Sequence, residues 1–158
     1  MKARNLLSLK KKDMLFKKIG IGSDHAGFNI KTFLKEELLK KGIEVVDFGT
    51  NSDDSTDYPD YAHPLAHAVE TGDCEVGIAI CGSGNGINMT VNKHQGIRSA
   101  VCWNTEIAYL ARLHNNANIC ALPGRFLKQQ EAMKIINAFF TTGFEGGRHK
   151  RRVDKIPV

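Results

Sequence analysis

The sequence predicts an α/β protein with a five-stranded parallel sheet covered by helices on both faces. Five short apolar segments alternate along the chain with segments whose apolar residues recur at helical spacing. The segment 75–82 is an almost continuous apolar run, which is typical of a parallel strand buried on both sides. The length of 158 residues suits one domain with a sizeable core and is short for two.

Each expected element follows from its local pattern. Strands are expected at residues 17–25, 43–50, 75–82, 97–103 and 117–124, and helices at residues 28–42, 58–73, 85–96, 104–116 and 128–143. The first helix ends in a lysine-rich turn followed by Gly42, a common helix terminator. We expect the second helix to be interrupted near Pro64, because proline lacks a backbone N–H. Asn104 or Thr105 can cap the fourth.

The order of these elements predicts a binding crevice. Right-handed crossovers favour a three-layer αβα, Rossmann-like fold with strand order 2-1-3-4-5. Ligands of such sheets bind beyond the carboxyl ends of the strands, where the strand order reverses, here between strands 1 and 3. The loops that follow these two strands are Ser23-Asp24-His25 and the glycine-rich stretch that begins at Cys81. We therefore expect both loops at one crevice.

The charge of the chain is concentrated at its N-terminus. Residues 1–18 hold seven Lys/Arg and one Asp, whereas the rest holds 15 Lys/Arg against 16 Asp/Glu. A nearly neutral body is not the footprint of a nucleic-acid-binding protein. We assign residues 1–16 to a basic extension, expected to be disordered, and residues 17–158 to a single domain with a C-terminal tail. Met14 is a hypothetical alternative start of the natural protein.

Composition also indicates a cytoplasmic protein without a membrane anchor. No segment approaches the roughly 20 apolar residues needed to span a bilayer, and the N-terminus has no apolar signal core. The four cysteines form no C-x-x-C pair, so we expect free thiols rather than disulfides or a zinc knuckle. His63 and His67 are four residues apart, a spacing at which two histidines on a helix can bind one metal ion. The sequence offers no acidic third ligand at a suitable spacing, so we expect no metal there.

The stretch Gly82-Ser83-Gly84-Asn85-Gly86 raises a choice between a structural turn and an anion-binding site. It does not match the dinucleotide fingerprint, which needs the spacing G-x-G-x-x-G after the first strand and an acidic residue further on. It does not match a P-loop either, because no Gly-Lys-Ser/Thr follows. Glycines let backbone amides face a crevice, and the following helix adds its positive N-terminal end. Such a turn can stabilise an oxyanion that develops during a reaction.

Cys81 directly precedes this turn. Free cysteines are usually small buried apolar residues, and we interpret Cys74, Cys102 and Cys120 in this way. Cys81 differs because it should face the crevice near a helix N-terminus, which favours a thiolate able to act as nucleophile or general base.

Two histidines and a basic segment are further candidates. His25 follows Asp24 in a strand-end loop, and His114 stands at the end of the helix 104–116. The segment 148–152 is either a solvated basic tail or a phosphate clamp that reaches a neighbouring subunit, because arginine forks suit phosphate.

Several motifs in one order resemble a known family over residues 17–153. They are SDHAGF, TDYPDYA, ICGSGNGI, NKHQGIRSAVC, LARLHNNANI and FEGGRH. Together they resemble the type B ribose-5-phosphate isomerases, a family that includes galactose-6-phosphate and allose-6-phosphate isomerases. The resemblance implies a Rossmann-like homodimer, or a tetramer built as a dimer of dimers, that uses no metal or organic cofactor. It implies interconversion of an aldose phosphate and a ketose phosphate through an enediolate, in the non-oxidative pentose phosphate pathway.

The resemblance also implies roles for individual residues. Cys81 matches the base that moves a proton between C1 and C2, and His114, with Ser83 assisting, matches the group that opens the furanose ring. The backbone amides that match the anion hole are those of Gly82, Ser83, Gly84, Asn85 and Gly86. The sugar-binding positions are matched by Asp24, His25, Tyr58 and Asn115, and the phosphate-binding positions by Arg125, Arg148 and Arg152. One branch of the family uses a glutamate after the turn, where this chain has Ile87.

Three functions compete at this point. They are a ribose-5-phosphate isomerase, an isomerase of a six-carbon sugar phosphate such as allose 6-phosphate or galactose 6-phosphate, and a flavodoxin-like nucleotide or flavin carrier. The sequence contains no nucleotide-binding fingerprint that would support the carrier, and a carrier would not need a reactive thiol at Cys81. The sequence leaves open the pocket length that separates five-carbon from six-carbon substrates, and the basic extension departs from the family pattern.

Overall fold

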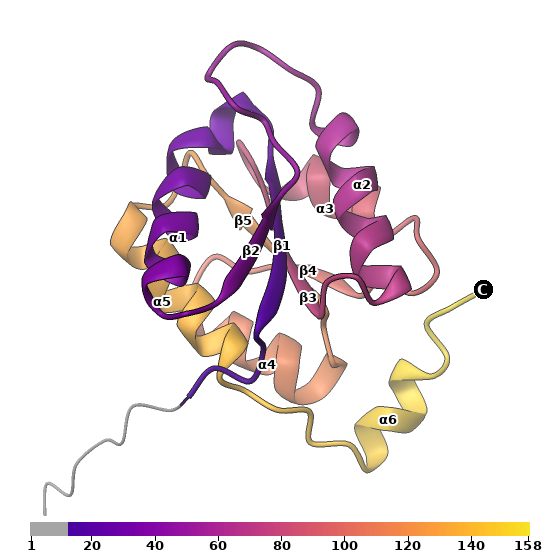
Figure 1. Ribbon diagram of the computed structural model, residues 1–158. Helices are drawn as coiled ribbons and strands as arrows, with labels where there is room; N and C mark the ends of the chain where they lie inside the picture. Colours follow the sequence, from indigo (N-terminus) through magenta and orange to yellow (C-terminus); the bar gives the residue numbers. More distant parts are fainter. Residues whose placement is uncertain (1–12) are drawn as a thin grey trace, which may run out of the picture.

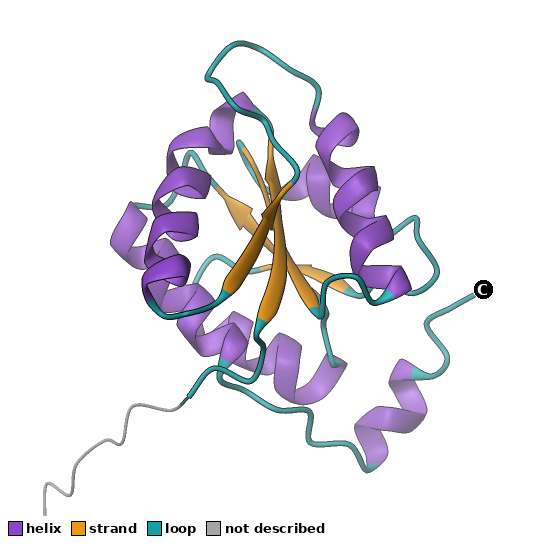
Figure 2. Cartoon of the chain, in the orientation of Figure 1, coloured by secondary structure: helices purple, strands orange, loops and turns teal. Residues whose placement is uncertain are grey.

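The computed structural model describes residues 13–158 as five strands and six α-helices, with one short 3-10 helix (Figures 1 and 2). The strands are β1 (Lys18–Ser23), β2 (Glu44–Asp47), β3 (Val76–Cys81), β4 (Ser99–Val101) and β5 (Ile119–Pro123). The helices are η1 (His25–Gly27), α1 (Phe28–Lys40), α2 (Tyr58–Thr71), α3 (Asn85–Val91), α4 (Thr105–Asn115), α5 (Gln129–Phe140) and α6 (Arg148–Val153). None of the described helices is both long and apolar enough to cross a membrane.

All five strands are parallel, in the order β2-β1-β3-β5-β4. The αβα, Rossmann-like fold is therefore confirmed, as is the placement of the first three strands. The expected order of the last two strands is wrong, because β5 pairs with β3 and β4 lies at the edge. The register sets Gly77 opposite Ile119, and Cys81 opposite Pro123.

Burial explains the exchange of the last two strands. Every residue of β5 is buried, whereas β4 has three residues and all are partly exposed. A longer, fully apolar strand gains more from a central position, where both of its faces are covered. The side chain of Asn92 accepts from the N–H of Ser99 at 2.8 Å and donates to its carbonyl at 3.0 Å, so it satisfies the free edge of β4.

Two helical layers cover the sheet. Helices α1, α4 and α5 pack on one face through a large apolar cluster, and α2 and α3 pack on the other (Figure 1). Helix α2 runs unbroken across Pro64, so the expected interruption is wrong. Helix α6 lies outside the three layers, next to the end of α4 (Figure 2).

The segment before β1 packs against the domain where it is described. Residues 1–12 of the expected extension lie outside the described residues. The N–H of Leu15 donates to the carbonyl of Phe140 at 2.9 Å, and the ring of Phe16 meets that of Phe140 edge-on at 5.8 Å. The guanidinium of Arg112 lies 5.1 Å from the centre of the Phe16 ring. Residues 14–16 thus contribute to the face formed by α4 and α5.

A buried ion pair fixes the end of β2. The Nζ of Lys31, whose side chain is only 2% exposed, lies 2.8 and 2.7 Å from the two carboxylate oxygens of Asp47. Lys35 and the N–H of Gly49 also donate to this carboxylate. Burial alone would raise the pKa of Asp47, but the hydrogen bonds from Lys31, Gly49 and Lys35 together lower it. The loop that follows β2 is therefore held to α1.

We predict that Asp47→Asn destabilises the protein by about 3 kcal/mol at pH 7, because it leaves the buried ammonium of Lys31 without its counter-charge. The folded pKa of Asp47 lies below its unfolded value of about 3.9, so the stabilisation is complete above that pH and is lost as the pH falls through the folded pKa. Urea unfolding measures the free energy of unfolding of both proteins at pH 7 and at pH 3. The difference between the variant and the wild type should be smaller at pH 3.

Lys31→Met is the matched control for this variant. It fills a similar volume and leaves Asp47 paired with Lys35 and Gly49, so its loss at pH 7 should be smaller. An equal deficit of the Asp47 variant at both pH values would contradict the assigned contribution of the ion pair.

Candidate active site

Cys81 ends the central strand β3 and is held there by the neighbouring strand. Its side chain is 4% exposed, and its carbonyl accepts from the N–H of Gly124 at 2.8 Å. The next carbonyl, of Gly82, accepts from the N–H of Arg125 at 3.0 Å. The thiol therefore sits at the end of a rigid strand, as the sequence predicts, but Cys81 packs in the core and is not among the residues that line the cavity described below.

The turn after Cys81 requires glycine for physical reasons. Gly84 has a φ of 78°, and a Cβ there would lie 3.1 Å from the carbonyl carbon of Leu122 and 3.2 Å from the nitrogen of Pro123. Gly84 is the N-cap of α3, so the first amides of that helix lack intrahelical partners. The hydroxyl of Ser83 accepts from the N–H of Asn85 at 3.3 Å. The turn thus presents backbone donors beside the thiol-bearing strand end.

The loop after β1 meets the same edge of the sheet. The carboxylate of Asp24 accepts from the N–H groups of Ala26 at 3.0 Å and Gly27 at 3.3 Å, and so caps η1. The Nδ1 of His25 accepts from the N–H of Thr56 at 3.2 Å. In a neutral imidazole with Nδ1 accepting, Nε2 carries the proton, and it can donate to a ligand.

A cavity of about 570 Å³ lies at this edge, within the size range of small-molecule sites. It is lined by Asp24, His25, Ala26, Ser55, Thr56, Asp57, Tyr58, Pro59, Asp60, Gly82 and Arg125. Five expected site residues therefore line one cavity. Arg125 packs over Gly82, where an added Cβ would lie 3.1 Å from its guanidinium nitrogen, and Tyr58 covers Gly86 in the same way.

Most of the loop that lines this cavity was not predicted from the sequence. Ser55, Thr56 and Asp57 line it, yet none was proposed as a site residue, although Thr56 and Asp57 begin the motif TDYPDYA. Their signal in the sequence is weak, because a polar run such as residues 51–57 is typical of any exposed loop. The loop is brought to the cavity by backbone bonds: Ser23 N–H donates to Gly49 at 2.8 Å, and Thr50 N–H to Ser23 at 2.7 Å.

Four other expected site residues lie at the opposite edge of the sheet: His114, Asn115, Arg148 and Arg152. Helix α4 begins after the carboxyl end of β4 and returns to the amino end of β5, where Asn118 N–H donates to the Arg98 carbonyl at 2.9 Å. Cys81 lies opposite Pro123, the last residue of β5, whereas the four residues lie near its first residue. The length of this five-residue strand, roughly 16 Å, therefore separates them from Cys81. Asn115 lines a different pocket, of about 310 Å³. One chain does not bring these residues to the cavity.

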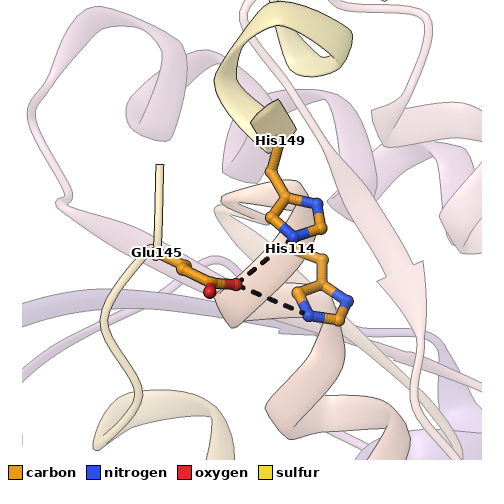
Figure 3. A group of neighbouring side chains, drawn as sticks. All are labelled: His114, Glu145 and His149. Carbon is orange, nitrogen blue, oxygen red and sulfur yellow. Dashed lines mark ion pairs between the residues drawn. The ribbon is translucent and has the colours of Figure 1, made fainter. Parts of the chain in front are cut away.

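His114 belongs to a compact cluster with Glu145 and His149 (Figure 3). The two imidazole rings stack with their centres 4.2 Å apart and an angle of 10° between their planes. The Nε2 of His149 lies 3.3 Å from Oε2 of Glu145, and the Nε2 of His114 lies 3.7 Å from the same oxygen. Burial lowers the pKa of His149, and His114, Arg148 and Arg152 lower it further against the opposing effect of Glu145.

Glu145 and His149 were also missed from the sequence. Both stand in the motif FEGGRH, four residues apart, a spacing that places side chains on one side of a helix. The segment up to Gly147 is not helical, however, so the pairing depends on how the loop turns before α6.

Comparison with known proteins identifies the family of this chain. Residues 19–156 match the family model described as Ribose/Galactose Isomerase. The chain belongs to the ribose/galactose isomerase family. Within it, the chain is 44% identical over 140 residues to ribose-5-phosphate isomerase B of Escherichia coli, with 89% of this chain and 94% of that protein aligned.

Solved structures of ribose/galactose isomerases share the fold. The ribose 5-phosphate isomerase of Thermotoga maritima is 48% identical with a TM-score of 0.87, covering 89% of this chain and 97% of its own. The ribose-5-phosphate isomerase B of Mycoplasma genitalium, solved with bound ribulose-5-phosphate, is 44% identical with a TM-score of 0.85, covering 91% of this chain and 95% of its own.

We predict that Gly84→Ala lowers the free energy of unfolding of this isomerase by about 1–3 kcal/mol, because alanine at a positive φ is strained and its Cβ meets fixed backbone. Gly86→Ala is the matched control: its Cβ would lie 2.5 Å from the Tyr58 ring, but that side chain is 37% exposed and can move. Urea unfolding measures both variants. An equal or larger loss for Gly86→Ala would contradict the assigned role of Gly84.

Proposed function

We propose that this protein interconverts D-ribose 5-phosphate and D-ribulose 5-phosphate through an enediolate, in the non-oxidative branch of the pentose phosphate pathway. The proposal rests mainly on the position of Cys81, which ends β3 and precedes the glycine-rich turn that leads into the N-terminus of α3. The E. coli and T. maritima relatives bear the name of this activity, and the M. genitalium relative holds its product. Membership of the family sets the reaction class.

The chemistry needs a base on one side of the substrate and a charge sink on the other. The Cys81 thiolate takes the proton from C2 of the open-chain aldose, and the electron pair moves through the new C1–C2 double bond to the C1 oxygen. The amides from Gly82 to Gly86 stabilise that oxyanion. The thiol then returns the proton to C1 while the proton on the C2 oxygen passes to the C1 oxygen, which yields the ketose. A base and an oxyanion site each contribute roughly 100-fold or more.

Binding and ring opening require further groups. Asp24, His25 and Tyr58 hold the sugar at the cavity, with the Nε2–H of His25 as a donor. Arg125 offers a planar fork to the phosphate. His114, with Ser83 assisting, moves the proton between the C1 hydroxyl and the ring oxygen, and so converts the furanose to the open chain. Proton transfers of this kind are performed by these side chains without a cofactor.

The active site is shared between two chains of a homodimer. His114, Asn115, Arg148 and Arg152 lie at the amino edge of the sheet, away from the cavity of their own chain. In a two-fold dimer each amino edge can meet the partner's carboxyl edge, and both sites are completed at once. Large apolar side chains are exposed on α3 and α4 and on the loops after β4 and β5, as an interface requires: Met89, Trp103, Tyr109 and Phe126.

The proposed compartment is the cytoplasm. All four cysteines are free and buried. Unpaired cysteines are the rule in reducing compartments, whereas secreted proteins of this size commonly form disulfides.

Steady-state kinetics with three substrates test the proposed activity. We expect the highest kcat/KM for ribose 5-phosphate and lower values for allose 6-phosphate and galactose 6-phosphate, because relatives named for the five-carbon substrate align over about nine-tenths of the chain. A higher kcat/KM with either six-carbon sugar phosphate would assign the protein to the other branch of the family.

Subunit complementation tests the shared site. Cys81→Ala and His114→Ala should each abolish turnover of the cyclic sugar phosphate when present in both chains. After mixing and subunit exchange, about half the dimers are hybrids, and each hybrid has one site with both lesions and one intact site. Activity should therefore rise to about a quarter of the wild-type value. Cys74→Ala, which removes a thiol remote from the cavity, is the control and should remain active.

No recovery after verified exchange would place His114 in the same site as its own Cys81, or show that the protein is not a dimer. Near-normal turnover by Cys81→Ala alone would show that the base is another group.

A further inference from the structure

We propose that His114, Glu145 and His149 form a binding site for a divalent transition-metal ion of the zinc class (Figure 3). The three side chains come from the end of α4, the loop before α6 and the first turn of α6. Two imidazoles and one carboxylate are a common ligand set for zinc. The site lies at the amino edge of the sheet, away from the cavity of its own chain, and in the proposed dimer it would face the cavity of the partner.

The distances fit a shared ion better than direct contacts. Charge-assisted N–H···O bonds are normally 2.7–2.9 Å long, whereas the two contacts to Oε2 of Glu145 measure 3.3 Å from His149 and 3.7 Å from His114. Tetrahedral ligands at zinc bond lengths of about 2.0–2.1 Å lie roughly 3.3 Å from one another. All three ligand atoms lie within 4.8 Å of one another, and the two stacked imidazole rings must turn relative to each other until both ring planes contain the ion.

A buried polar atom points to the missing ligand independently. The His149 side chain is 9% exposed, and its Nε2 has no hydrogen-bond partner among the described residues. In Figure 3 this nitrogen faces the carboxylate of Glu145. An unsatisfied buried nitrogen is costly, and native structures contain few. A metal ion would use the lone pair of this nitrogen.

The ligands are held in place and are accessible. Glu145 N–H donates to the carbonyl of Leu113 at 3.0 Å, which ties the loop to the turn of α4 next to His114. His149 N–H donates to Gly146 at 3.1 Å, and the two rings are stacked. In the single chain the side chains of His114 and Glu145 are 36% and 56% exposed, so in the proposed dimer an ion would reach them through the shared active site, as a substrate does. Three protein ligands leave a fourth position for water or a ligand oxygen.

Charge and ligand chemistry limit the choice of ion and its affinity. Imidazole nitrogens favour Zn²⁺, Cu²⁺, Ni²⁺ and Co²⁺ over Mg²⁺ and Ca²⁺, which prefer oxygen. Arg148 and Arg152 are close enough to act electrostatically on His149, and they also repel a bound cation. We therefore expect weaker binding than in a closed four-ligand site.

A bound ion should also inhibit isomerisation. This consequence rests on the proposed function, in which His114 moves a proton of the cyclic sugar. A metal ion would occupy the Nε2 of His114 and remove it from proton transfer. Inhibition by Zn²⁺ should be reversed by a chelator and should decrease as the sugar phosphate concentration rises.

The test measures metal binding directly, by Zn²⁺ titration calorimetry and by the absorption spectrum of bound Co²⁺ on the full chain. We expect one ion per chain in the wild type and at least a ten-fold weaker affinity in Glu145→Gln and in His149→Gln. Glu145 is exposed, so Glu145→Gln should fold normally, and circular dichroism checks both variants.

Two controls remove a thiol and a histidine pair elsewhere in the described part of the chain. Cys81→Ser removes the thiol at the end of β3, and His63→Ala/His67→Ala removes the histidine pair on α2, together with the contact between His63 and His94. Both should bind the ion like the wild type. Loss of binding in either control, a cobalt–thiolate band, or unchanged binding in Glu145→Gln and His149→Gln would overturn the proposed site, as would the absence of binding to the wild type.

The activity measurement separates this proposal from the proposed function. If Glu145→Gln loses Zn²⁺ binding and Zn²⁺ inhibits the wild type, the metal site and the role given to His114 are both supported. Binding without inhibition supports the metal site and contradicts the role given to His114. Isomerase activity without metal binding overturns the metal site and leaves the proposed function intact.

Discussion

The common direction of the five strands is the constraint on which the whole site depends. Because all strands are parallel, every carboxyl end lies at one edge of the sheet, and the helical connection between successive strands returns the chain to the other edge. Cys81 ends β3 at the first edge, and His114 ends α4 at the second. No side-chain rotation brings these two residues together within one chain. The proposed dimer follows from this geometry, since a two-fold partner can supply the missing edge.

The carboxyl edge is made rigid by bonds between loops rather than by packing alone. The ends of β3 and β5 are joined through Cys81 and Gly124, and the loop after β2 is joined to the end of β1. The ion pair between Lys31 and Asp47 anchors that loop to α1. A base and a set of oxyanion donors must keep fixed positions to be effective, because the enzyme then spends no free energy on reorganisation during the reaction. The central strand supplies this rigidity to Cys81.

The amino edge is organised differently. Helix α6 is short and lies outside the three layers, and it is attached to α4 through the cluster of His114, Glu145 and His149. The same three residues thus hold α6, with Arg148 and Arg152, in a fixed relation to His114. Proton transfer by His114 and binding of a metal ion would both use the Nε2 atom of His114. Substrate and ion are therefore expected to exclude one another at this edge.

The sequence by itself determined the five strands and five of the six described α-helices, the parallel sheet and the cavity-facing positions after β1 and β3, but not α6. These follow from local rules. The periodicity of apolar residues indicates strands and helices, and the glycine-rich stretch Gly82–Gly86 indicates a tight turn at the end of a strand. Tertiary structure decided the order of β4 and β5, because burial of the whole sheet, not chain order, places the more apolar strand inside. It also paired Glu145 with His114, 31 positions apart, through a backbone bond to Leu113 that no local pattern specifies.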